Sequence, residues 1–331
     1  MNVIHHDPAL ALADRWQRDF PICRRPFAAI GEAEGLPEAE VIERFRQLKD
    51  QGVLGRIGAA VRPNTVGAST LAAMAVPPDR LTDVAQIVSA EPGVNHNYQR
   101  EHELNVWFVV TESDRAAVAR TLGRISERTG ITVFDLPLER AYHIDLGFRL
   151  AGSRRKPDRK PEAPSDYSAD RNDRALLGAI EDGLALTPEP FAPLAQELDL
   201  DEADVLGRLE RLVSASVISR FGCILRHRPL GYRANAMAVW DVPDDTVDRI
   251  AERLAERDAV TLCYRRTRRL PDWPYNLFAM VHGRERVDVQ AQIAEAERAA
   301  GLSGYGSAIL FSRRCFKQRG AVFSQAARGT A

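Results

Sequence analysis

Two histidines, a tyrosine and an arginine crowd into one short stretch of the sequence, VNHNYQREHELNVWF at 94–108. Histidine can move protons or bind iron near neutral pH, and arginine holds carboxylates through paired N–H donors. Side chains alternate along a strand, so a strand here would place four residues on one face: Val94, His96, Tyr98 and Arg100. Such a row suits an acidic ligand that has to be protonated.

The opposite face of the same strand would carry Asn95, Asn97 and Gln99, so both faces are largely polar. A strand in a helix-covered sheet normally buries one face, and departures from that rule are expected at functional sites. A single histidine is more often an ordinary polar side chain than a catalyst. The alignment of His96 with a tyrosine and an arginine nevertheless favours a site.

The length and charge of the chain set broad limits. Its 331 residues suffice for about two domains, and 45 Lys and Arg nearly balance 46 Asp and Glu, so overall charge indicates neither nucleic acid nor an acidic membrane surface. The sequence has no basic start followed by an apolar run and no stretch long enough to cross a membrane, so we expect a cytoplasmic protein. The cysteines form no CxxC pair and are expected to be reduced, mostly buried thiols: Cys23, Cys223, Cys263 and Cys315.

The chain repeats itself. VIERFRQLKDQGVLGRIG (41–58) matches VLGRLERLVSASVISRFG (205–222) at an offset of 164 residues. The charged, Pro-containing segment 151–173 has the composition of a linker and separates the two halves. These features predict an internal pseudo-dimer. Further matches pair AMAV (73–76) with AMAV (236–239), NYQR (97–100) with CYRR (263–266), Asn105 with Asn276, and Arg140 with Arg314.

Each copy begins with helical periodicity and then a β-rich segment, which is typical of a winged helix-turn-helix. A strand–helix–strand–strand–helix–strand order follows, as in ferredoxin-like domains. We therefore expect an α+β protein with two tandem copies of a winged helix-turn-helix followed by a ferredoxin-like βαββαβ domain. The expected bounds are 18–62 and 175–228 for the winged helices, 66–150 and 232–323 for the ferredoxin-like domains, and 151–173 for the linker.

This architecture resembles the leucine-responsive Lrp/AsnC regulators, which makes a DNA-binding transcription regulator the natural alternative. A recognition helix should open with residues that face phosphates and bases. Here the candidate helices open with PEAEVIE and DLDEADV, whose carboxylates suit a helix start but repel a polyanion. Basic residues follow at Arg44, Arg46 and Lys49, so the alternative stays open although DNA is not the expected partner.

The two halves are not chemically equivalent. The copy VTLCYRR (260–266) keeps Tyr264 and Arg266 but has Leu262 where the first half has His96. The run of arginines at 265–269 is either part of a ligand site or a solvated hairpin tip. The first half also has Leu104 where the second has Tyr275, so the two halves make different contacts at that point.

The tandem with HNYQREHELNVWF in one half and CYRR…YNLFAMV in the other resembles the sirohaem decarboxylases of the alternative haem and haem d1 pathways, in their fused two-subunit form. The resemblance spans 18–150 and 175–323. It implies a carboxy-lyase that converts sirohaem to 12,18-didecarboxysirohaem by releasing two acetate carboxyls as CO2. The macrocycle supplies the electron sink, so no cofactor is implied and the iron belongs to the substrate. A non-catalytic haem or sirohaem sensor is a third alternative.

The resemblance also assigns roles to residues. His96 would be the proton donor and Tyr98 would orient it or the substrate; alternatively, His96 would be an axial ligand of the substrate iron. Because Leu262 replaces histidine, either one site performs both decarboxylations or the second uses His227, His282 or Lys317. The resemblance also leaves open an association with related decarboxylase subunits. The expected substrate-binding residues are Arg62, Arg100, His102, Asn105, Tyr264, Arg265 and Arg266.

Overall fold

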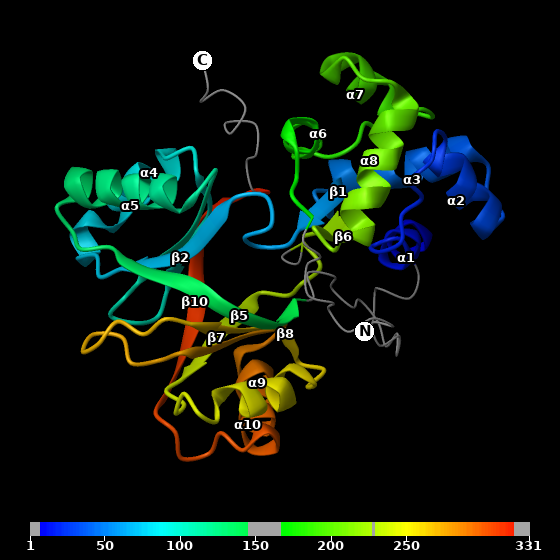
Figure 1. The fold of residues 1–331 in the computed structure, drawn as a ribbon. Helices are drawn as coiled ribbons and strands as arrows, with labels where there is room; N and C mark the ends of the chain where they lie inside the picture. The colour runs from blue at the N-terminus through cyan, green and yellow to red at the C-terminus, as the bar shows by residue number, and fades with distance from the viewer. Residues whose placement is uncertain (1–6, 145–166, 227–228, 321–331) are drawn as a thin grey trace. The chain divides into compact units, whose positions relative to one another are not determined.

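The computed structural model describes residues 7–144, 167–226 and 229–320 (Figure 1). The chain divides into two compact units. One unit contains the helix-turn-helix segments of both copies, and the other contains both ferredoxin-like segments. Within the described residues, no helix is both long and apolar enough to cross a membrane.

The helix-turn-helix unit repeats one pattern. Its apolar positions follow the predicted helical period, and Phe27, Val41 and Phe45 are fully buried. Helix α2 ends at Gly35, whose φ of 68° is left-handed and easily adopted by glycine. The first copy supplies α1 (Pro8–Arg15), α2 (Pro26–Glu34), α3 (Glu38–Asp50) and β1 (Leu54–Val61); the second supplies α6 (Arg171–Ala179), α7 (Phe191–Leu198), α8 (Glu202–Ser214) and β6 (Ile218–Leu225).

The wings differ from the prediction. Each copy was expected to form its own β-rich wing, but β1 pairs antiparallel with β6, with Gly58 opposite Gly222. A strand needs a partner for its backbone N–H and C=O groups, and the repeat supplies one in the other copy. The two wings are therefore one shared sheet.

The predicted domain bounds also need correction. Helix α1 precedes residue 18, and α6 begins inside the segment 151–173 that was predicted as linker. Asp170 and Asp173 form a capping box at the start of α6, which explains why the helix begins there despite the charged composition. The linker up to residue 166 lies outside the described residues.

The second unit is a closed barrel in which the strands follow the order β10-β3-β4-β2-β5-β8-β9-β7. Each copy contributes the predicted βαββαβ elements. The first copy provides β2 (Ala68–Met74), α4 (Leu81–Ala90), β3 (Val94–Arg100), β4 (Val106–Glu112), α5 (Arg115–Thr129) and β5 (Phe134–Ile144). The second provides β7 (Ala234–Trp240), α9 (Val247–Ala255), β8 (Val260–Arg266), β9 (Leu277–Gly283), α10 (Arg286–Ala300) and β10 (Ser307–Gln318).

Strands β5 and β10 close the barrel. The pairing partner changes at Leu138 in β5 and after Phe311 in β10. The first part of each strand pairs within its own copy, and the last part pairs with the other copy: β5 with β8, and β10 with β3. This exchange leaves no open edge in the barrel, which removes unpaired backbone groups.

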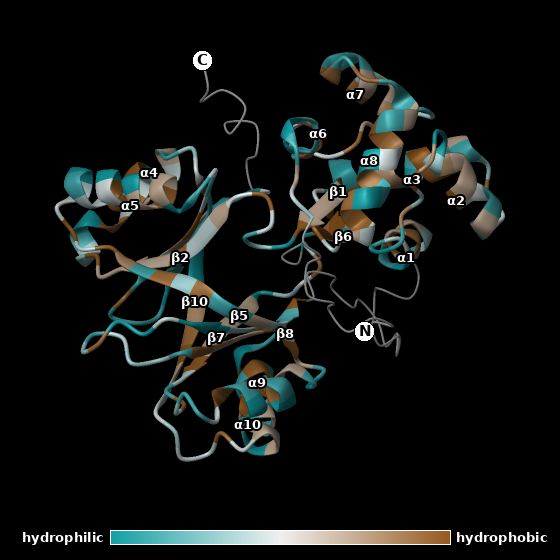
Figure 2. Ribbon diagram, in the orientation of Figure 1, coloured by the Kyte–Doolittle hydropathy of each residue, from teal (hydrophilic) through white to brown (hydrophobic). Residues whose placement is uncertain are grey.

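The barrel unit has three apolar layers. Helices α4 and α5 cover β2, β3 and β4 through residues such as Val84 and Ile125, while α9 and α10 cover the second copy through residues such as Ile250 and Ile293. Figure 2 shows these helices with both hydrophobic and hydrophilic faces. The third layer fills the barrel interior with side chains of both copies, including Trp107, Trp273 and Phe278.

The helix-turn-helix unit allows a direct test of its packing. A Cβ on Gly222 would lie 2.5 Å from the Gln17 carbonyl oxygen and 2.6 Å from that of Trp16, so Gly222→Ala forces the segment after α1 to move. We expect the free energy of unfolding in urea to fall by about 1–3 kcal/mol. Gly207→Ala in α8 should raise it by about 0.5–1 kcal/mol, because the added methyl meets only the Arg211 side chain at 3.4 Å. Equal effects of the two substitutions would contradict this packing.

Candidate active site

The histidine row lies on the inner face of β3. The rings of His96 and Tyr98 are nearly parallel, with centroids 6.2 Å apart, and the Arg100 guanidinium lies 5.8 Å from the Tyr98 ring centroid. Tyr98 is opposite Trp107, a residue of the interior layer. The predicted shared face of these three residues is therefore confirmed.

Val94 does not belong to that face, contrary to the prediction. The register of β3 against β4 shifts between Val94 and His96, so a β-bulge reverses the alternation. Val94 packs instead in the layer beneath α4 and α5. Simple alternation fails here because one extra residue is enough to exchange the two faces.

The polar residues on the other face of β3 are held by local partners. Asn97 is fully buried, and its Nδ2 donates to the Ala85 carbonyl at 3.1 Å and to Ser89 Oγ at 3.0 Å, both in α4. Asn95, at the bulge, donates to Thr111 Oγ1 of β4 at 3.2 Å. The bonds of Asn97 to helix α4 therefore give its polar side chain a structural explanation.

Strand β10 supplies residues opposite the row that the sequence did not indicate. Gln318 is paired with His96, Cys315 with Tyr98 and Ser312 with Arg100. The repeat had matched Arg140 with Arg314, but nothing in that match placed β10 beside β3. None of the four cysteines is in a disulfide, which agrees with the prediction of reduced thiols; Cys223 and Cys263 are buried, whereas Cys23 and Cys315 are only partly so.

Arg100 and Arg266 occupy matching places in the two copies. Arg100 Nη1 donates to the Leu310 carbonyl at 3.1 Å, and Arg266 Nη1 donates to the Leu136 carbonyl at 2.9 Å. The acceptor in each case belongs to the exchanged strand of the other copy. Each Nε is buried and has no hydrogen-bond acceptor among the described residues.

Burial lowers the pKa of both guanidiniums to about 10. Neither makes a close ion pair with a carboxylate in the described part of the chain, although Asp135 acts on Arg266 from a longer distance and raises its pKa. Arg100 is buried and Arg266 is partly buried. A cation withdrawn from water without a close counterion is costly, so this interior favours an anionic ligand. The site can therefore bind carboxylates, which is the chemistry predicted for these two residues.

The corresponding row on β8, Leu262, Tyr264 and Arg266, repeats the first row without its histidine. Arg266 lies 5.2 Å above the Tyr264 ring, and burial raises the pKa of Tyr264 to about 12. Arg265 was grouped with Arg266, but it points to the opposite face and pairs with Glu139 at 2.8 Å and Asp244 at 3.2 Å. Of these two arginines, only Arg266 faces the barrel interior.

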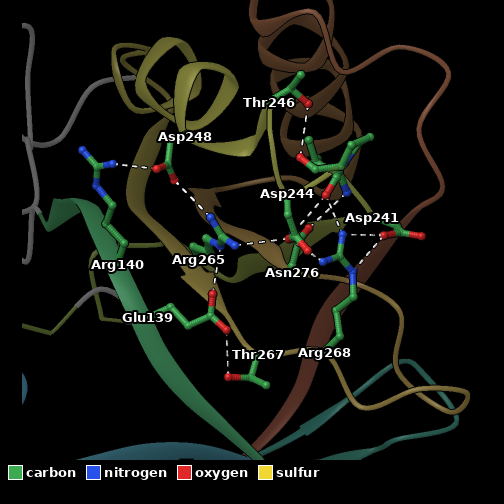
Figure 3. A network of polar contacts seen from close by, with 12 residues as sticks. Glu139, Arg140, Asp241, Asp244, Thr246, Asp248, Arg265, Thr267, Arg268 and Asn276 are labelled. Carbon is green, nitrogen blue, oxygen red and sulfur yellow. Dashed lines mark hydrogen bonds and ion pairs between the residues drawn. The ribbon is translucent and has the colours of Figure 1, made fainter.

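Figure 3 shows the charge network to which Arg265 belongs. Asp248 of α9 binds Arg140 of β5 at 2.8 Å and also bonds the Tyr142 hydroxyl. The network therefore ties the exchanged part of β5 to the second copy. Arg268 joins it through Asp244 at 2.7 Å, so much of the arginine run is paired rather than a solvated hairpin tip.

The side chains of Asn105 and His102 form hydrogen bonds with backbone groups. Asn105 accepts from the Val76 N–H at 2.9 Å and donates to the Val76 carbonyl at 2.8 Å. His102 Nδ1 accepts from the Leu104 N–H at 3.0 Å, and its ring lies 5.3 Å from that of Trp273. Burial lowers the pKa of His102, which favours the neutral form. These contacts support structural roles for both residues.

The asparagine contacts also correct the sequence alignment. Asn276 bonds the N–H and carbonyl of Val242 at 3.0 and 2.9 Å, as Asn105 does with Val76. Val76 therefore corresponds to Val242, whereas the AMAV match aligned it with Val239. The identical AMAV sequences shifted the alignment by three residues, because structural equivalence follows from the backbone contacts and not from identical sequence.

The remaining predicted residues make other contacts or lie outside the described residues. Arg62 belongs to the helix-turn-helix unit, where its Nε donates to the Ser216 carbonyl at 3.1 Å. Lys317 donates to the Ser89 carbonyl at 2.6 Å at the end of α4, away from the row. His282 Nδ1 lies 3.0 Å from Thr261 Oγ1 in the second copy, and His227 is outside the described residues. Within the part of the chain that is described, no group of three His, Cys, Asp or Glu residues could hold a metal ion.

Two family models match the chain. The AsnC-like ligand binding domain matches residues 66–143 and 229–317, and the siroheme decarboxylase NirDL-like HTH domain matches residues 11–54 and 173–218. These matches support the tandem arrangement, with each domain type present twice.

Curated and solved proteins agree with the family models. The siroheme decarboxylase NirDL subunit of Paracoccus denitrificans is 47% identical, covering 97% of this chain and 98% of its own. The siroheme decarboxylase NirD subunit of Pseudomonas aeruginosa is 49% identical, covering 45% of this chain and 99% of its own. A crystal structure of the siroheme decarboxylase NirDL in complex with an iron-uroporphyrin III analogue is 26% identical, with a TM-score of 0.71 and coverage of 96% of this chain and 94% of that chain.

Asn105→Ala separates a structural role from ligand binding. Loss of both contacts to Val76 leaves a backbone N–H and a carbonyl unpaired, so the free energy of unfolding should fall by about 2–3 kcal/mol. Asn276→Ala should lose at least as much, because Asn276 also bonds Asp244 at 3.1 Å. Urea denaturation measures both. Unchanged stability of Asn105→Ala would contradict the structural role and return Asn105 to the ligand site.

Proposed function

We propose that this chain, which belongs to the sirohaem decarboxylase family, converts sirohaem to 12,18-didecarboxysirohaem by releasing two acetate carboxyls as CO2. The near-full-length relationship supports the reaction. The observation in the chain itself that carries the proposal is the pair of guanidiniums, Arg100 and Arg266, whose buried Nε atoms lack a hydrogen-bond acceptor among the described residues, beside a histidine–tyrosine row.

The reaction needs protons and an electron sink. Protonation of a ring carbon next to the acetate allows the bond to the carboxyl carbon to break, and its electron pair moves into the macrocycle as CO2 leaves. A second proton then completes the methyl group while the first is returned. Each decarboxylation therefore consumes one proton overall, and the macrocycle acts as the sink.

We assign the proton transfer to His96. Imidazole can both give and take a proton near neutral pH, as this sequence of steps requires. Tyr98, whose ring stacks beside that of His96, orients the histidine or the macrocycle. The competing role for His96 is axial coordination of the substrate iron, for which imidazole is equally suited.

We assign carboxylate binding to Arg100 and Arg266. Their positions in pseudo-equivalent rows place one guanidinium in each copy, and a carboxylate would satisfy the unpaired Nε of each. Since only the first copy has histidine in its row, we propose that the first half carries out the chemistry. The second half then contributes binding through Tyr264 and Arg266.

The two alternative functions, a DNA-binding regulator and a non-catalytic sensor, are less well supported. In α3, Arg44 pairs with Glu40 and Arg46 with Glu43, which reduces the charge available to a nucleic acid. A non-catalytic sensor would not account for close relatives named as decarboxylases. Association with related subunits, a cytoplasmic location and the lack of a separate cofactor remain predictions.

His96→Ala tests the proton-donor role. Anaerobic incubation of the wild-type protein with sirohaem should give a tetrapyrrole that has lost two CO2, measured by mass spectrometry. The variant should bind sirohaem, as followed by absorption, with a decarboxylation rate about 10²–10⁴-fold lower. The control His102→Ala should keep a rate within about tenfold of the wild type. Normal turnover by His96→Ala would exclude His96 as proton donor, and loss of the iron–imidazole spectrum would favour the axial-ligand role.

Arg100→Met tests carboxylate binding. Burial of the Arg100 charge costs on the order of 3 kcal/mol at neutral pH, so the ligand-free variant should gain about 1 kcal/mol in stability. Its affinity for sirohaem should fall about 10–100-fold. Arg265→Met, on the opposite face, should leave affinity nearly unchanged. Absorption titration and urea denaturation give the two readouts; unchanged affinity of Arg100→Met would contradict the assignment.

A further inference from the structure

A third unpaired N–H donor lies in the barrel interior. Trp273 is fully buried, and its Nε1 has no acceptor among the described residues. The neighbouring Trp107, whose ring centroid is 4.9 Å away, donates its own Nε1 to the Leu104 carbonyl at 2.6 Å. Buried N–H groups are rarely left unpaired, so the contrast between these tryptophans requires an explanation.

Trp273 lies between the two rows. On one side it contacts Trp107, which is opposite Tyr98. On the other side its ring lies 6.0 Å from Phe278, which is opposite Tyr264. The carbonyls that hold the two guanidiniums belong to Leu310 and Leu136, which pack in the same interior layer. Trp273 therefore belongs to the same apolar layer as the two leucines whose carbonyls bind Arg100 and Arg266.

The turn that carries Trp273 is held firmly. Arg268 binds Asp241 at 2.9 Å and Asp244 at 2.7 Å, at the end of β7 (Figure 3). Arg269 and Trp273 exchange backbone hydrogen bonds of 2.8 and 2.7 Å. Because the turn is fixed at both ends, the indole N–H has a defined direction before any ligand binds.

We propose that Trp273 Nε1 donates a hydrogen bond to a side-chain carboxylate of the bound tetrapyrrole and, with Arg100 and Arg266, forms a carboxylate subsite inside the barrel. The inference rests on the proposed function, because its ligand is the polycarboxylate macrocycle. In the first copy the corresponding turn, between Arg100 and Asn105, is shorter and contains no tryptophan. The subsite is therefore asymmetric and fixes which edge of the macrocycle faces the second copy.

Trp273→Phe tests the subsite, because it keeps an aromatic ring and removes only the donor and part of the ring volume. Sirohaem affinity, measured by absorption titration, should fall about tenfold. Both Trp273→Phe and Trp107→Phe lose buried ring volume, but only the latter also loses a hydrogen bond, so the melting temperature of ligand-free Trp273→Phe should fall less than that of Trp107→Phe. Iron uroporphyrin, a second polycarboxylate probe, should show a similar loss.

Trp107→Phe is the matched control. This neighbour loses a hydrogen bond to Leu104, so the melting temperature should fall while sirohaem affinity stays within about twofold. Wild-type affinity in Trp273→Phe, with wild-type decarboxylation intact, would overturn the subsite and leave the proposed function standing. Failure of the wild-type protein to bind or decarboxylate sirohaem would overturn both.

Discussion

The exchange of strands β5 and β10 between the two copies is the constraint on which the site depends. Each exchanged strand pairs with its own copy first and then with the other, so neither ferredoxin-like segment is complete alone. The exchange brings the Leu310 carbonyl to Arg100 and the Leu136 carbonyl to Arg266. The interior thus contains one guanidinium from each copy, and each is bound by a carbonyl of the other copy.

The barrel interior is stable, but the hydrogen-bonding capacity of these two guanidiniums is not fully used. The apolar layer around Trp107 and Phe278 provides the burial that holds the fold together, and the same burial lowers the pKa of the arginines. A ligand rich in carboxylates would supply the missing acceptors. The ligand-free protein is therefore less stable than it would be with apolar residues at these positions, and the same two guanidiniums give it affinity for the ligand.

Much of the fold follows from sequence periodicity. Phe27, Val41 and Phe45 are spaced for helices, and the order of elements in each copy predicts the βαββαβ arrangement. The strand exchange could not be predicted, because pairing between distant strands leaves no mark on local periodicity. The bulge that separates Val94 from His96 was hidden for a similar reason, since a single extra residue does not change the composition of the strand.

The candidate site was partly predictable. The row of His96, Tyr98 and Arg100 follows from alternation along one strand, and the repeat identifies Arg266 as its partner. Asn105 was predicted to contact the ligand, whereas its bonds to Val76 support a structural role, because a polar residue beside a site looks the same in sequence whether it bonds backbone or ligand. The role proposed for Trp273 was not predicted, although the longer turn of the second copy indicated a difference between the two halves there.

A structure of the chain with sirohaem bound would show whether the two arginines bind the carboxylates of the substrate. We expect substrate carboxylates within hydrogen-bond distance of Arg100 and Arg266, with the macrocycle against His96 and Tyr98. A tetrapyrrole bound elsewhere, with both guanidiniums still lacking an anionic partner, would contradict this expectation.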